Sequence, residues 1–122
     1  MSIYFKKVAD GLVEFSSKEV QELLWNKDHG NNGSHMSSFV EAGEGLFGDS
    51  GLSNALKEGD TEGINPSAVP LLKELDEKLR LIEYPRPEEQ VINDPLMQEV
   101  RILAAKLLVI GVESGKPLGY TH

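Results

Sequence analysis

Two long apolar stripes at helical spacing in the second half of the chain constrain the fold more than any other feature of the sequence. In the region 67–83, apolar side chains recur every three or four residues, which predicts a helix with one apolar face. These residues are Leu72, Leu75, Leu79 and Ile82. Pro85 and Pro87 end this helix, because proline lacks the backbone donor that a helix needs.

A second long helix is predicted to begin at Asp94, a favourable N-cap residue, with Pro95 in its first turn. Its apolar stripe consists of Leu96, Val100, Leu103, Leu107 and Ile110. Ile102 and Val109 make this helix apolar over more than half of its circumference, so we expect it to be central or partly covered by a partner. A connection of about ten residues favours antiparallel packing of the two long helices.

Residues 2–15 are predicted to form a β-hairpin. Ile3-Tyr4-Phe5 and residues 12–15 are rich in aromatic and β-branched side chains, and Asp10-Gly11 between them is a strong turn signal. A short helix ending near Trp25 is predicted to follow, because Ser16 and Glu19 have the spacing of a capping box. Such a segment buries too little surface to be stable alone. The predicted fold is therefore mainly α within the α+β class, with this hairpin and short helix packed on two long antiparallel helices.

The sequence Gly33-Ser34-His35-Met36 resembles the scar that remains where a cleavable histidine tag meets a cloned reading frame. Inside a chain, it suggests that two polypeptides have been joined. We interpret residues 1–30 as the hairpin and short helix of a fused partner fragment, 31–36 as a linker and 37–122 as an acidic helical domain. A tether of this kind keeps two interacting segments at a high effective concentration. The alternative is a natural loop that happens to contain these four residues.

The negative charge belongs mainly to the predicted helical domain. The whole chain has 20 acidic and 12 basic residues and a formal net charge of −8, and fifteen of the acids with eight of the bases lie in residues 37–122. A net acidic protein repels the phosphates of nucleic acid, so we expect no nucleic-acid partner. The uncharged stretch 107–112 is far too short to span a bilayer, so we expect no membrane association.

Residues able to carry out catalysis or to bind a cofactor are not arranged in any recognisable pattern. The chain has no cysteine, which excludes disulfides, thiol catalysis and zinc sites built on cysteine. His29 and His35 lie in or beside the predicted linker, and His122 is the last residue. The many carboxylates are typical of solvated helix surfaces. We therefore predict no catalytic residue, no metal ligand and no cofactor.

These observations favour a non-catalytic protein–protein interaction module, such as an adaptor, a chaperone-like protein or an assembly factor, located in the cytoplasm. The residues predicted to bind a partner are Phe15, Val20, Leu23, Leu24 and Trp25 in the first segment, and Val100, Leu103, Leu107 and Ile110 in the last helix. Two alternatives remain open. One is a small enzyme or hard-metal-binding protein that uses carboxylates, and the other is an acidic inhibitor that mimics DNA.

Overall fold

A computed structural model describes residues 3–25 and 38–114 of the chain, and within these ranges the regular structure is helical. The helices are α1 (Phe5–Ser16), α2 (Lys18–Trp25), α3 (Phe39–Gly43), the π-helix η1 (Glu44–Asp49), α4 (Leu52–Glu58), α5 (Val69–Leu81), α6 (Glu88–Ile92) and α7 (Pro95–Ile110). An isolated bridge between Ile64 and Glu113 is the only β-type pairing of the described residues. The predicted linker 31–36 lies outside them.

The N-terminal β-hairpin was a wrong prediction, and with it the α+β class, because residues 5–16 form helix α1. The positions Phe5, Val8, Leu12 and Phe15 share one face of a helix, and the last three of them are buried. Gly11 does not turn the chain but lies inside the helix against η1. Tertiary packing on this face outweighs the local turn signal of Asp10-Gly11.

The helix starts show which capping predictions were confirmed. The Ser38 side chain accepts a hydrogen bond from the backbone N–H of Glu41 at the start of α3. The Asp94 side chain accepts a hydrogen bond from Leu96 N at 2.8 Å, with Pro95 at the start of α7, as predicted. Helix α2 differs from the prediction, because the Ser17 hydroxyl, and not Ser16, accepts from the N–H of its third residue, Val20, at 3.2 Å.

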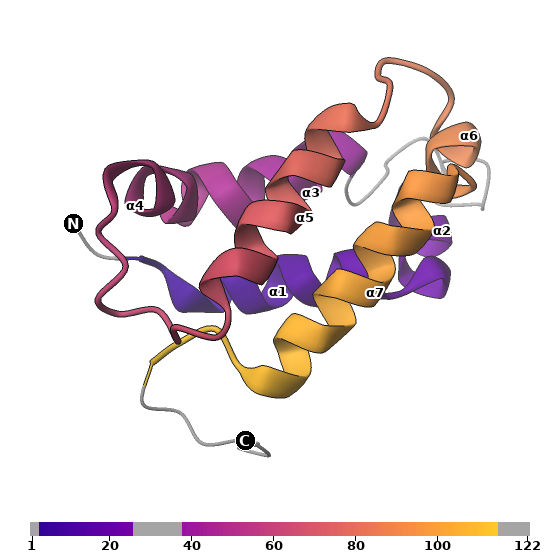
Figure 1. Ribbon diagram of the computed structural model, residues 1–122. Coiled ribbons are helices and arrows are strands. Elements are labelled where there is room, and N and C mark those ends of the chain that lie inside the picture. The colour runs from indigo at the N-terminus through magenta and orange to yellow at the C-terminus, as the bar shows by residue number, and fades with distance from the viewer. Residues whose placement is uncertain (1–2, 26–37, 115–122) are drawn as a thin grey trace.

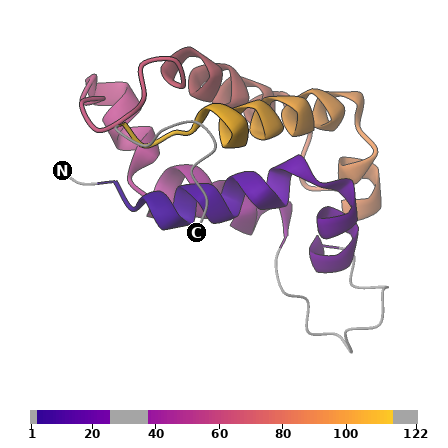
Figure 2. The ribbon, with the colours of Figure 1, turned by 90° about the horizontal axis from the view of Figure 1, so that it is seen from below.

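The long helices form two layers. Figure 1 shows α5 and α7 side by side and running in opposite directions. Figure 2 shows α1 and α3 in a second layer beneath them, with α1 against α7. Helix α7 thus contacts both α1 and α5, so it occupies the centre of the helix packing.

A single hydrophobic core lies between these layers, and it draws side chains from both sides of the predicted linker. Before the linker, Phe15 and Trp25 contact each other edge to face at 5.8 Å between ring centroids. After it, Phe39 lies 6.0 Å from Trp25 and 6.4 Å from Phe15. The two described stretches therefore pack as one folded unit. None of its helices combines the length and apolar character needed to cross a membrane.

Candidate functional site

An apolar strip on the solvent side of α7 is the candidate site. Val109 is 69% exposed, Ile102 is 50% exposed and Leu108 is 39% exposed, and the small side chain of Ala105 between them is also exposed. Residues 102, 105 and 109 have the three- and four-residue spacing that places side chains on one helix face. We call Ile102, Ala105, Leu108 and Val109 the outer strip.

The outer strip lies on a helix whose other side is fully used by the fold. The side chains of Val100, Leu103 and Leu107 are buried against the rest of the core. At the C-terminus, Gly111 has a φ of 85° and donates its N–H to Leu107 O at 2.9 Å, which ends the helix directly after Ile110. The strip is therefore held on a rigid element and not on a loop.

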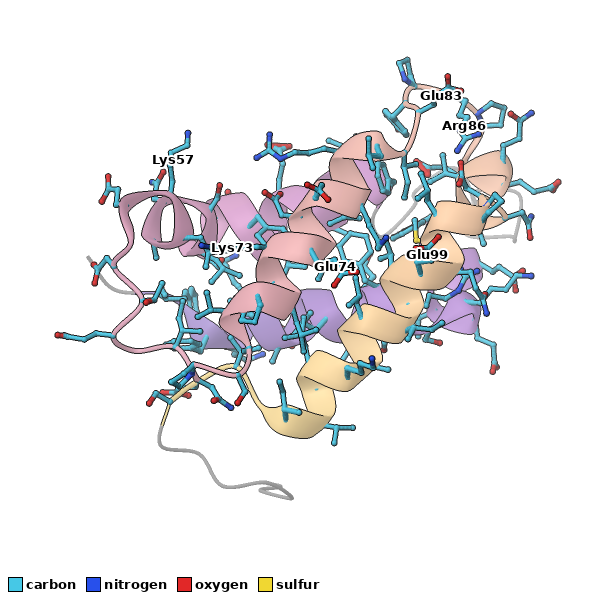
Figure 3. All side chains as sticks on the ribbon, viewed as in Figure 1. Lys57, Lys73, Glu74, Glu83, Arg86 and Glu99 are labelled. Carbon is cyan, nitrogen blue, oxygen red and sulfur yellow. The ribbon has the colours of Figure 1, made fainter. Side chains whose placement is uncertain are left out.

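Polar contacts fix α7 to its neighbours on both flanks. Lys78 of α5 lies 2.7 Å from the Glu99 carboxylate and 3.9 Å from Glu74. Figure 3 shows Glu74 and Glu99 on either side of the seam between α5 and α7. The hydrogen bond to Glu99 is the main cause that raises the pKa of Lys78, and burial opposes it.

On the other flank, Arg101 connects α7 to α2 and α6. Its Nη1 donates to the Oε1 of fully buried Gln21 at 2.6 Å and to the Ile92 carbonyl at 3.2 Å. The Gln21 amide in turn donates to the Phe15 carbonyl at 3.0 Å. Burial lowers the pKa of Arg101. Both Glu99 and Arg101 are thus committed to internal contacts.

Lys106 is the charged residue of α7 whose side chain makes no hydrogen bond or ion pair with any described residue. It is exposed and stands four residues after Ile102 and three before Val109, so its side chain lies along the edge of the outer strip. The strip therefore combines an apolar surface with one uncommitted positive charge, on a chain whose formal net charge is −8.

The α7 residues predicted to bind a partner lie on the opposite side of the helix from the outer strip. Val100, Leu103 and Leu107 are buried, and Ile110 is partly buried against the same core. Their stripe is the core face of the helix. The exposed residues Ile102 and Val109 were visible in the sequence as apolar positions in excess of that stripe, whereas Ala105 and Lys106 carried no separate signal.

The predicted residues of the first segment also divide by burial. Phe15 and Trp25 are buried, and the Trp25 indole N–H donates to the Glu14 carboxylate at 2.6 Å. Val20 and Leu24 are partly buried, and Leu23 is 62% exposed. The structure brings Phe15 and the α7 stripe together in one core, while Leu23 alone of this set points mainly to solvent.

The acidic side chains do not gather into a site with obvious chemistry. Within residues 3–25 and 38–114, no cluster of three or more His, Asp or Glu side chains could hold a metal ion. The hydrogen bond from Arg86 is the main cause that lowers the pKa of Asp94. A lowered pKa keeps this carboxyl group ionised, which is the opposite of what a general acid needs at neutral pH.

No family model, no curated protein and no solved structure matches the chain.

Proposed function

We propose that this protein is a protein–protein interaction module and that it binds a protein partner through the outer strip of α7. The observation that carries the proposal is the exposure of Ile102, Leu108 and Val109 on one continuous helix face. Exposed apolar residues that occur singly are normal on a protein surface, but apolar residues that adjoin one another mark interaction sites. Helix α7 packs against α1 and α5 through its other faces. The outer strip is therefore not needed for either of these contacts.

The partner chemistry follows from the strip and its edge. A partner helix or sheet face with its own apolar stripe would bury Ile102 and Val109, and a carboxylate beside that stripe would pair with Lys106. Such a charge contact at the rim contributes to specificity and association rate more than to affinity. We also propose a cytoplasmic location, which is expected from the absence of cysteine.

The test is affinity capture from the cells that naturally express the protein containing residues 37–122, comparing the wild-type chain with the double variant Ile102→Ser and Val109→Ser. We expect the wild type to retain a discrete partner and the double variant to lose it, with an affinity at least about ten-fold lower. The matched control is Val13→Ser, which removes a similarly exposed apolar side chain from α1. Equal capture by all three proteins, or equal loss in both variants, would contradict the proposal.

A further inference from the structure

A second apolar surface lies away from α7, in a groove of about 320 Å³ between α5 and the α3–η1 segment. Its apolar lining comes from Phe39, Val40, Phe47 and Leu79. Gly43 and Gly48 complete this part of the lining, so that no side chain covers the backbone there. The groove shares no residue with the outer strip.

Packing does not require glycine at these two positions. A Cβ atom added at Gly43 or at Gly48 would meet no neighbouring atom within 4 Å, and Gly43 has an ordinary helical φ of −64°. Glycine is less favourable than alanine in a helix interior. Gly43 and Gly48 therefore lower the stability of this helical segment for no reason that packing explains. Their effect on the structure is to leave the groove free of side chains at these two positions.

The backbone at the groove is also unusual. Residues Glu44–Asp49 form a π-helix, in which hydrogen bonds join residues five apart and which is frequently found at functional sites. Gly43 and Gly48 are five residues apart, so the wide turn places both on the groove side. The π-helix and the two glycines are independent observations that point to the same surface.

The size of the groove suggests what it holds. Pockets for small molecules and cofactors run from about 300 to 1,000 Å³, so this one is at the low end of that range. One or two large side chains would fill it. Apolar anchors that enter such pockets dominate the energy of protein–protein interfaces.

The charged residues around the groove indicate which charge a partner segment should carry beside its apolar anchor. On the wall formed by α3, η1 and Ser53, the one charged lining residue is acidic, Glu44. On the other wall, Arg80 pairs with Asp76 at 3.1 Å, which cancels both charges. Glu44 is exposed at the groove. The occupant should therefore be basic, and a second copy of this chain, with its net charge of −8, is disfavoured by repulsion.

We propose that the groove between α5 and the α3–η1 segment binds a basic amphipathic helix of a partner protein, which inserts a large apolar side chain beside Gly43 and Gly48. Helices approach each other closely where one of them lacks side chains, and a lysine or arginine flanking the anchor would face Glu44. Together with the outer strip, the groove gives the protein two separate binding surfaces of different chemistry, as an adaptor needs.

The experiment uses two fluorescein-labelled synthetic helical peptides with the same leucine stripe. One carries lysine and the other glutamate at the flanking positions, and fluorescence anisotropy measures their binding to the full chain. We expect the basic peptide to bind at least about ten-fold more tightly than the acidic one. Glu44→Lys should weaken the basic peptide and strengthen the acidic peptide.

Gly48→Leu distinguishes occupation of the groove from general attraction to an acidic protein. Leucine at position 48 meets no atom within 4 Å at its Cβ, so we expect a folded variant that binds the basic peptide about ten-fold more weakly. Gly45→Leu is the matched control, because Gly45 is in the same π-helix and equally unobstructed but does not line the groove. Gly43→Leu repeats the test at the second groove glycine.

Three results would overturn the proposal. The first is equal binding of the basic and the acidic peptide, and the second is an equal effect of Gly45→Leu and Gly48→Leu on binding of the basic peptide. The third is concentration-dependent self-association that Gly48→Leu abolishes, because a second copy of the chain would then be the occupant. The double variant Ile102→Ser and Val109→Ser should bind the basic peptide like wild type. Failure of the groove proposal is thereby distinguished from failure of the outer strip.

Discussion

Gly11 allows α1 to lie directly against η1. A Cβ atom at this buried position would be 2.8 Å from the Leu46 Cβ and 3.2 Å from its Cα. We therefore expect Gly11→Ala to lower the free energy of unfolding by about 1–3 kcal/mol through overpacking, although alanine is the better helix former. Urea unfolding followed by Trp25 fluorescence measures this.

Gly45→Ala is the control for that measurement, because a Cβ there meets nothing within 4 Å. It should raise the free energy of unfolding by up to about 1 kcal/mol. If Gly11→Ala were as stable as Gly45→Ala, the close contact between α1 and η1 would not exist.

Gln21 and Arg101 form a buried polar contact between α2 and α7. Arg101→Met leaves the buried Gln21 Oε1 without its 2.6 Å donor, so we expect a loss of about 1–3 kcal/mol in the free energy of unfolding. Arg80→Met, which breaks an exposed pair with Asp76, should change stability by less than about 1 kcal/mol. Equal losses in Arg101→Met and Arg80→Met would contradict the buried network.

At the scale of elements, the helices with long apolar stripes were the predictable ones. Helices α5 and α7 lie where the apolar stripes of residues 72–82 and 96–110 indicated, because these stripes extend over several turns with clear stop signals. Helix α1 was not predictable in this way. Its aromatic and β-branched residues and Asp10-Gly11 suit a hairpin locally, and the contact that decides for a helix comes from Leu46, far along the chain.

The start of α7 depends on an ion pair that is sensitive to pH. Arg86, held by the Glu83 carbonyl at 3.0 Å, pairs with the Asp94 carboxylate that caps the helix (Figure 3 labels Glu83 and Arg86). Because this contact lowers the pKa of Asp94 in the folded state below its ordinary value of 3.8, it stabilises the protein fully above that value. The stabilisation is lost as pH falls through the lower, folded-state pKa.

Asp94→Asn isolates this effect, since asparagine caps a helix about as well as aspartate. We expect a loss of about 1 kcal/mol in the free energy of unfolding at neutral pH and a smaller difference from wild type in acid. Urea titrations at neutral pH and near pH 3 measure both values. A difference between the proteins that stays constant across this range would exclude the ion pair as its cause.

At the scale of the whole molecule, both sides of the predicted linker contribute to one core, in which Phe15 and Trp25 contact Phe39. We expect a chain with residues 33–36 replaced by a protease recognition sequence to stay assembled after cleavage. The two pieces should co-elute in gel filtration, with the Trp25 emission unchanged. Separation of the pieces would show that the tether, through its effective concentration, and not the packing, holds them together.

The candidate site was only partly accessible to sequence reasoning, for a physical reason. Both sides of α7 are apolar, so the sequence indicated a surplus at Ile102 and Val109 but could not tell which side faces the core. The core side, with Val100 and Leu107 buried, is decided by α1 and α5 together, because both pack against α7, and α1 had been predicted as a hairpin. The groove at Gly43 and Gly48 depends on how η1 is placed against α5. The spacing of apolar residues along the sequence does not predict this placement.

The most direct test of the central claim, that the outer strip of α7 binds a protein, is photo-crosslinking in the cells that naturally express the protein containing residues 37–122. A photoreactive amino acid replaces Ala105 at the centre of the strip, and in a matched variant it replaces Lys57, an exposed residue of α4 that points away from the molecule in Figure 3. We expect position 105 to give a discrete protein adduct that Ile102→Ser and Val109→Ser abolish, and position 57 to give none. The absence of an adduct at position 105, or the same adduct from both positions, would contradict the claim.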